Sequence, residues 1–199
     1  MNNIKNPNHP PKGCSTKAEP IRSKRAINNI KKLLADQPRD LCLFTLGINT
    51  GYRANEILSI TVGQVRHLKP GDSLTIKQSK NGKYRSTPLN KTVITTIQQW
   101  LREPRAPIHD DQPIFTGQRG ALTVQTVSKY VKGWCRDVGL IGNYSSHTMR
   151  KTWGYWQRVG NGASLSLLVQ AFGHSSERQT LDYLCIQAEE ISELYEMEL

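Results

Sequence analysis

Apolar residues recur at helical spacing through most of this chain, and capping residues mark where the helices begin. Ser23 precedes residues 24–36, whose apolar side chains fall on one helix face. Pro38 opens a second segment that is apolar enough to be buried, and Gly51 ends it. The same signals predict further helices over residues 53–60, 91–101, 123–138, 147–159, 164–172, 176–186 and 188–198.

The hydrophobic period changes after the third of these segments. Residues 72–79 and 83–89 alternate in character around Asn81-Gly82, a dipeptide typical of a tight hairpin turn. Residues 64–68 are expected to add a third strand. The sequence therefore predicts a mainly α protein with one small antiparallel β-sheet, an α+β fold.

The length of 199 residues, of which 37% are apolar, suits one domain with short tails. Residues 1–20 hold four prolines and many polar side chains, which indicates a flexible N-terminal tail. We expect the folded domain to span residues 21–187 and a separate C-terminal helix to occupy residues 188–199.

The net charge of +11 is unevenly distributed. Residues 22–32 contain no acid, and residues 66–85 contain only Asp72, whereas residues 189–199 hold five glutamates and no base. Basic stretches of this kind favour a polyanion such as DNA, although an ordinary solvated basic surface is the alternative. The side chains expected to contact DNA are Arg22, Lys24, Arg25, Lys77, Lys83 and Arg85.

Other sequence features narrow the protein class. Four scattered cysteines without a C-x-x-C pair indicate neither a zinc site nor a disulfide framework. No apolar run approaches the ~20 residues of a membrane span, and residues 1–20 lack the apolar core of a secretory signal. These observations predict a protein of the reducing cytoplasm with no membrane partner.

Candidate chemistry lies in five short stretches. They are TGYRANEIL (50–58), the hairpin turn with its lysines, SSHTMR (145–150), FGHSS (172–176) and TLDYL (180–184). The residues of interest are Arg53 with Glu56, Lys80, His147 with Arg150, His174, and Tyr183 nine positions after His174. An H-x-x-R pair alone is common by accident, but residues three apart on a helix share a face, so one site can use both.

In order and spacing, these stretches resemble the catalytic domain of the tyrosine recombinases, the phage-integrase family of DNA breaking and rejoining enzymes. The resemblance covers about residues 25–186. Tyr52, Met149 and Phe172 replace residues that are usually leucine, and Lys151 stands where a second histidine is frequent and is given no catalytic role. Many members carry an additional N-terminal DNA-binding domain, so this chain is either a short member or a catalytic domain alone.

The resemblance implies a role for each cationic residue at the scissile phosphate. Arg53 and Arg150 would clamp the non-bridging oxygens, for which a planar, permanently charged fork is well suited. Glu56 would support the site, although a plain surface salt bridge between Arg53 and Glu56 is the alternative. His174 would donate a hydrogen bond to the phosphate.

The remaining implied roles concern proton transfer and covalent chemistry. Tyr183 would be the nucleophile that leaves a 3′-phosphotyrosine, and the alternative is a core tyrosine on an apolar helix face. A phenol with a pKa of about 10 needs help near neutral pH, and His147 would be the base. Lys80 would protonate the leaving 5′-oxygen, with Lys83 and then Lys77 as competing choices.

The resemblance therefore implies a site-specific DNA recombinase (integrase) that acts in integration, excision or inversion. It implies double-stranded DNA as a partner, no cofactor and no metal. The chain would be a monomer when free and a homo-tetramer on synapsed DNA, with residues 188–199 docking on a neighbouring protomer and accessory DNA-bending proteins as further partners. It would act in the cytoplasm, associated with the nucleoid and encoded by a bacterium or phage. The alternatives are a type IB topoisomerase-like relaxing enzyme and a non-cleaving DNA-binding regulator of the same fold.

Overall fold

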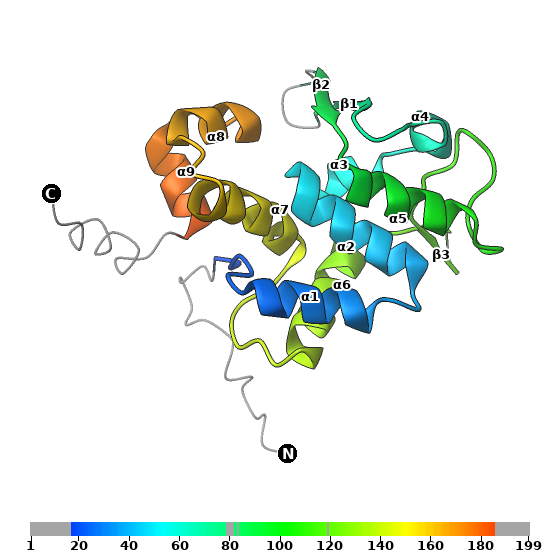
Figure 1. Ribbon diagram of the computed structural model, residues 1–199, viewed down its shortest axis with the longest axis horizontal. Coiled ribbons are helices and arrows are strands. Elements are labelled where there is room, and N and C mark those ends of the chain that lie inside the picture. Colours follow the sequence, from blue (N-terminus) through cyan, green and yellow to red (C-terminus); the bar gives the residue numbers. More distant parts are fainter. Residues whose placement is uncertain (1–16, 79–81, 83, 119, 186–199) are drawn as a thin grey trace, which may run out of the picture.

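The computed structural model describes residues 17–78, 82, 84–118 and 120–185. Helix α2 lies at the centre, where it contacts α1, α3, α5 and α7 (Figure 1). The helices are α1 (Lys24–Leu33), α2 (Pro38–Thr50), α3 (Ala54–Leu58), α4 (Val62–Val65), α5 (Lys91–Leu101), α6 (Val124–Asp137), α7 (Ser146–Tyr155), a π-helix (Trp156–Gly160), α8 (Leu165–Phe172) and α9 (Glu177–Leu184).

Capping side chains set the helix starts much as the sequence predicts. Ser23, Asn90 and Thr123 each accept a hydrogen bond from the backbone N–H three residues further on. Gly51 ends α2 with φ of +62°, a conformation that glycine adopts without steric cost. The largest differences from the predicted ends are at two helices. Helix α1 stops at Leu33, and the helix expected over 147–159 becomes a π-helix at Trp156.

A β-hairpin covers one side of the helices, formed by β1 (Ser73–Lys77) and β2 (Tyr84–Pro88). Leu74 and Ile76 of β1 point inward and are buried, and Ile76 pairs with Arg85 of β2. A second two-stranded sheet, β3 (Thr116–Gly117) with β4 (Gly120–Ala121), was not predicted. The described residues confirm the predicted fold class of mostly helix with small antiparallel sheets.

The strand predicted over residues 64–68 is wrong. Residues Val62–Val65 form helix α4, and the reason lies in the residue before it. Thr61 and Gln64 form a capping box in which Gln64 Oε1 accepts the Thr61 N–H at 2.9 Å. This local bond gives a backbone N–H at the start of the helix its acceptor. In so short a segment, it favours a helix more than the alternation of apolar and polar residues favours a strand.

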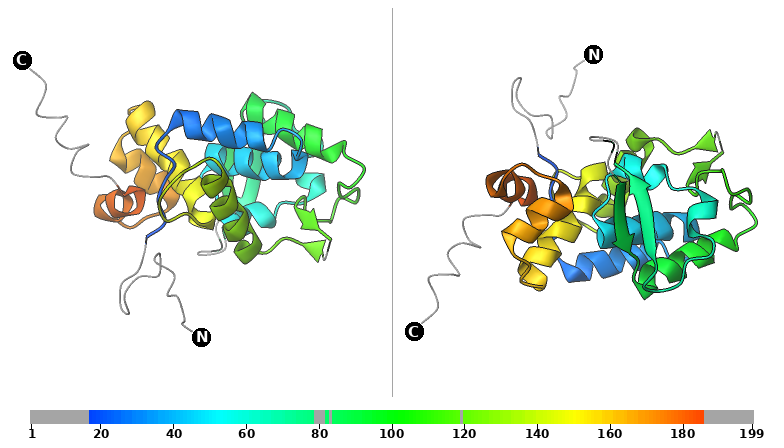
Figure 2. Two further views of the ribbon diagram at one scale, coloured as in Figure 1. Left: turned by 90° about the horizontal axis from the view of Figure 1, so that it is seen from below. Right: turned by 90° about the horizontal axis from the view of Figure 1, so that it is seen from above.

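The buried apolar residues fall into two clusters of unequal size. The larger one surrounds α2, whereas the smaller one contains only Leu168, Phe172 and Leu184, with Trp153 and Tyr183 packed against it. Helices α8 and α9 form this second lobe at one end of the molecule, and α7 connects it to the rest (Figures 1 and 2). The helix expected over 188–198 lies outside the described residues.

Candidate active site

Arg53 lies where the turn after α2 becomes helix α3. Its extended backbone (φ −72°, ψ 154°) makes it the N-cap, and its N–H donates to Glu56 Oε2 at 2.7 Å. Its guanidinium Nη1 also donates to Glu56 Oε1 at 2.8 Å. Because Glu56 is only 1% exposed, its carboxylate is a fixed support that holds both ends of Arg53. The simple surface ion pair is therefore a poor description of this contact.

Arg150 is the largest fully buried side chain, at 2% exposed, among the described residues. Its guanidinium donates to the carbonyl of Gly51 and, at 2.8 Å, to the carbonyl of Phe172. Arg53 Nη2 reaches the same Phe172 carbonyl at 3.5 Å. Two arginines from different helices thus converge on one oxygen atom. Burial lowers the pKa of Arg150 to about 10, so it stays protonated at neutral pH.

A third arginine, Arg85 of β2, closes the same end of α8. It donates to the carbonyls of Ala171 at 2.9 Å and Thr50 at 3.4 Å, and it lies over the Tyr52 ring at 4.4 Å. Burial lowers its pKa, and the charge of Glu56 opposes that shift. The last carbonyls of α8 are therefore held by arginine side chains. This places Arg85, which was expected to contact DNA, in an inward structural position.

His174 and Tyr183 meet beside the end of α8. Gly173 ends that helix with φ of +63°, and His174 follows directly. Its Nδ1 lies 2.9 Å from Thr180 Oγ1, and its ring stacks on Phe172 with centroids 5.0 Å apart. The Tyr183 ring lies 5.1 Å from the His174 ring and 5.2 Å from the Phe172 ring. Phe172 therefore links all four expected residues of this part of the site: Arg53, Arg150, His174 and Tyr183.

The Tyr183 hydroxyl is buried and makes no hydrogen bond of ordinary geometry. Burial raises the pKa of this phenol, while Arg150 and Arg53 act in the opposite direction. The arginines therefore act to stabilise a phenolate, and Arg150 has the larger effect of the two. A buried phenol beside two guanidinium groups favours the role of a nucleophile over that of the core tyrosine which the apolar helix face suggested.

His147 lies in the first turn of α7, which Ser145 caps. The residue as a whole is exposed, yet the protein removes part of the hydration of its imidazole. This desolvation is the largest cause that lowers the pKa of His147, and the charges of Lys151, Arg150 and Arg53 act in the same direction. The imidazole is therefore neutral near pH 7 and able to accept a proton.

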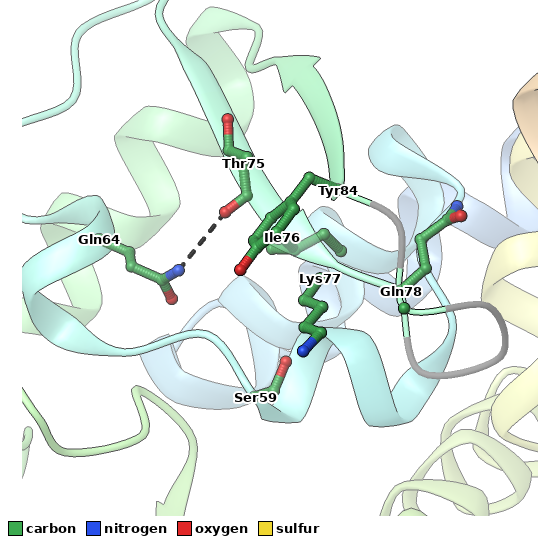
Figure 3. A pocket seen from close by; sticks show the side chains of 8 residues that line it. Ser59, Gln64, Thr75, Ile76, Lys77, Gln78 and Tyr84 are labelled. Atoms are coloured by element: carbon green, nitrogen blue, oxygen red, sulfur yellow. Dashed lines mark hydrogen bonds between the residues drawn. The ribbon is translucent and has the colours of Figure 1, made fainter.

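The expected lysines are only partly described. Lys80 and Lys83 lie outside the described residues, so their place relative to the arginines stays a prediction. Lys77 ends β1 and lines an open pocket on the hairpin with Ser59 and the exposed Tyr84 (Figure 3). The pocket is not lined by any of the expected catalytic residues that the structure describes.

The three basic residues near the N-terminus of α1 differ in their surroundings. Lys24 and Arg25 are exposed, and the Lys24 ammonium group lies 5.0 Å from the centre of the Trp156 ring. Arg22 is half-buried, donates to the Cys185 carbonyl and lies 5.7 Å from the Tyr155 ring centre. Arg22 therefore ties the start of the domain to the end of α9, whereas the other two face solvent.

Sequence reasoning missed four contributors to the site. The Phe172 and Ala171 carbonyls have no signature in a sequence, because every residue carries one. Thr180, the partner of His174, lies six residues away across a turn. Its contact with His174 could be predicted only if the geometry of that turn were known. Arg85 did have a signal. A two-residue turn at Asn81-Gly82 would pair it with Gln78, which shares a strand face with the buried Ile76, and the structure pairs it with Ile76 itself.

Two short findings concern other kinds of site. No described helix is both long and apolar enough to cross a membrane. Within the described ranges, no three histidine, cysteine or acidic side chains lie close enough to hold a metal ion.

Comparison with known proteins gives one family match. Residues 22–190 match the phage integrase family. Tyrosine recombinase XerC of Caldanaerobacter subterraneus subsp. tengcongensis is 29% identical over 175 residues, covering 86% of this chain and 47% of the relative. The probable integrase/recombinase YoeC of Bacillus subtilis is 28% identical over 184 residues, covering 90% of this chain and 96% of the relative. The chain thus spans about half of the first relative and nearly all of the second.

Solved structures share the fold. XerH site-specific recombinase bound to palindromic difH substrate, in a post-cleavage complex, superposes with a TM-score of 0.74 at 22% identity, covering 92% of this chain and 53% of that one. The XerA recombinase gives a TM-score of 0.72 at 16% identity, covering 92% of this chain and 65% of that one. Identities this low establish the shared architecture and nothing finer.

Proposed function

We propose that this chain, which belongs to the phage integrase family, is a site-specific DNA recombinase that cleaves and rejoins strands through a 3′-phosphotyrosine. One observation carries the proposal: Arg53 and Arg150 share the Phe172 carbonyl as an acceptor. A guanidinium has five N–H donors, so these contacts orient both forks and leave donors for a phosphate. The Tyr183 ring packs against the side chain of the same residue, Phe172, with ring centroids 5.2 Å apart.

Cleavage follows from these positions. The Tyr183 phenol oxygen attacks phosphorus, a bond forms between them, and the bond from phosphorus to the 5′-oxygen breaks. The charge that builds on the non-bridging oxygens meets Arg53 and Arg150, and His174 donates a further hydrogen bond. The phosphotyrosyl bond keeps the energy of the phosphodiester, so attack by a 5′-hydroxyl rejoins the strand without ATP or another cofactor.

Two proton transfers complete the step. Neutral His147 accepts the proton of the Tyr183 phenol, for which its lowered pKa prepares it. Lys80 donates a proton to the leaving 5′-oxygen. Glu56 keeps the Arg53 fork in place through its two bonds to that residue.

The direct test is covalent trapping. The full chain is incubated with DNA that flanks its own gene, carrying a nick just beyond the scissile phosphate so that the cleaved 5′-hydroxyl fragment diffuses away. We expect a denaturation-resistant complex of protein and DNA. If the protein binds the flanking DNA but forms no such complex at any site, the result would indicate a non-cleaving DNA-binding regulator. Relaxation of supercoiled plasmid by the monomer, without recombination, would indicate a topoisomerase.

Lys80→Ala should slow cleavage strongly, and a substrate with sulfur at the 5′-bridging position should restore the rate. A thiolate leaving group needs no proton, so the general acid becomes dispensable. The measurement is the rate of covalent-complex formation on matched oxygen and sulfur substrates. Lys83→Ala is the control variant. Rescue of Lys83→Ala, without rescue of Lys80→Ala, would transfer the role to Lys83.

We also propose that double-stranded DNA lies against the solvent-facing basic residues. Lys24, Arg25 and Lys77 are exposed, and Lys83 is included from the sequence. Arg22 and Arg85 were part of the same prediction, but each is bound to backbone carbonyls. We therefore expect them to influence DNA binding less than the exposed side chains do.

The affinity for non-specific DNA should fall steeply with salt. The logarithm of the binding constant falls by about 0.9 per neutralised phosphate for each decade of salt. Arg25→Ala should make that slope shallower by about 0.9, the contribution of one phosphate contact. Arg85→Ala should leave the slope nearly unchanged. Equal slopes for the wild type and Arg25→Ala would remove Arg25 from the interface.

The assembly we propose is a monomer in free solution and a homo-tetramer on two synapsed sites, with DNA-bending proteins as accessory factors. Residues 188–199 would dock on a neighbouring protomer, which suits an acidic segment better than a place near DNA. The protein would act in the cytoplasm on nucleoid DNA. Sedimentation with and without paired DNA sites measures the assembly, and a tetramer without DNA would contradict it.

A further inference from the structure

Lys151 is a buried lysine without an acidic partner in the described structure. It is 4% exposed, and none of the salt bridges among the described residues includes it. Taking an ammonium group out of water is costly unless something compensates, so such a residue is rare in a protein core. Lys151 has no part in the cleavage step proposed for the arginines, the histidines and Tyr183.

The contacts of Lys151 fall on the segment that carries the nucleophile. Its Nζ lies 4.7 Å from the centre of the Tyr183 ring, over the face where a cation is attracted by the aromatic quadrupole. The same Nζ donates to Cys185 Sγ at 3.2 Å. Lys151 is on α7 and the other two lie at the end of α9, so one side chain joins two helices that pack together (Figure 1).

The end of α9 is held in an unusual conformation at this point. Cys185 has φ of +55°, and it is the one non-glycine residue with positive φ in the described part of the chain. Its carbonyl accepts a hydrogen bond from Arg22, while its sulfur accepts the bond from Lys151. A non-glycine residue keeps this backbone only where its surroundings enforce it. The two cations therefore fix the chain just after Tyr183.

We propose that Lys151 is a positioning residue for strand cleavage, whose buried ammonium group holds the Tyr183 ring and the end of α9 against α7. The inference rests on the proposed function. Without Lys151, the phenol would be free to turn away from Arg53 and Arg150. A misplacement of about 1 Å in a site of this kind can lower a rate by about 100-fold.

Lys151 also acts on the expected base. It lies four residues after His147 and so on the same face of α7. Burial is the first cause that lowers the pKa of His147, and Lys151, Arg150 and Arg53 are the charged groups that add to it. Removing the Lys151 charge should therefore raise the pKa of His147. Since the neutral imidazole is the active form, the acid limb of the cleavage profile should move to higher pH.

The test uses Lys151→Met, which keeps the length of the side chain without its charge, with Lys151→Gln as a second uncharged variant should the first not fold. Lys151→Arg retains the charge. Lys132→Met, an exposed lysine of α6, is the matched control. Circular dichroism and gel shift establish folding and DNA binding, which should stay within about three-fold of wild type because a buried side chain neutralises no phosphate.

The decisive readout is single-turnover cleavage of the nicked substrate against pH. We expect the uncharged variants to lower the plateau rate by about 10-fold or more and to shift the acid limb upward. Lys151→Arg should keep the wild-type acid limb, and Lys132→Met should match wild type throughout. A folded uncharged variant with wild-type rate and profile overturns the proposal. A plateau rate that is equally low in Lys151→Arg, with an unmoved acid limb in every variant, also overturns it, because the loss would then follow packing and not the charge.

A second readout does not depend on catalysis. Proton NMR of the DNA-free protein gives the pKa of His147, which should be higher in Lys151→Met than in wild type and unchanged in Lys132→Met. If wild type never forms a covalent complex, the proposed function fails while this comparison still stands. If the pKa of His147 is equal in all variants, the influence of Lys151 on the base fails whatever the enzyme does.

Discussion

Tyr183→Phe will form no covalent complex with nicked substrate, while its affinity for the same DNA stays within about two-fold of wild type. The change removes one oxygen atom and no charge, so the phosphate contacts that supply most of the affinity are kept. Stability should not fall either. The hydroxyl is buried without a hydrogen bond of ordinary geometry, and removing such a group costs nothing in lost partners.

The matched control for this change is Tyr144→Phe. Tyr144 is also buried, its hydroxyl donates to the Ile141 carbonyl at 3.3 Å, and neither Arg53 nor Arg150 is among the charges that act on it. It should cleave at the wild-type rate. A covalent complex that persists in Tyr183→Phe would assign the nucleophile to another residue. Parallel loss of binding and cleavage would make Tyr183 a structural residue.

Arg150→Lys should be the most damaging conservative change in the protein. Lysine keeps the charge but cannot reach both the Gly51 and the Phe172 carbonyl as the guanidinium does. A buried carbonyl left without its donor costs about 1–3 kcal/mol of unfolding free energy. The loss of one oriented donor at a developing negative charge lowers the rate by about 100- to 1,000-fold.

Urea unfolding and single-turnover cleavage measure these two effects on the same preparations. Arg136→Lys is the control, because Arg136 is exposed on α6 and its guanidinium donates only to Asp137 among the described residues. It should change neither quantity. An Arg150→Lys protein that is stable and active would show that a positive charge alone suffices at this position. The two hydrogen bonds of the guanidinium to the Gly51 and Phe172 carbonyls would then not be required.

The sequence predicted those parts of the candidate site whose residues lie close together in the chain. Arg53 and Glu56 lie three residues apart, the spacing at which the carboxylate of Glu56 can accept hydrogen bonds from the N-cap residue, and both bonds to Arg53 are present. His147 and Arg150 do lie on one helix, α7. The fold class followed from hydrophobic period and caps. These features depend on local geometry, which a sequence records directly.

What could not be read was decided by contacts between distant segments. Arg85 looked like a surface base, but its guanidinium lies inside because α8 offers carbonyls that need donors. Lys151 looked unremarkable until α9 was placed against α7. Helix α4 is different, because the capping box that starts it in place of the predicted strand is a local bond between Thr61 and Gln64. For Arg85 and Lys151, the deciding partners are remote in the sequence.

The division of the buried residues into two clusters has a consequence for the motions of this protein. Helices α8 and α9 rest on a cluster of only three fully buried apolar residues, far smaller than the one around α2. Local opening free energies follow the apolar contacts that a segment makes. The amides of α9 should therefore exchange with deuterium sooner than those of α2, through openings that leave the larger cluster intact. The proposed nucleophile, Tyr183, is thus carried by a helix pair with few fully buried apolar residues, and those few contacts limit how long its ring keeps one position.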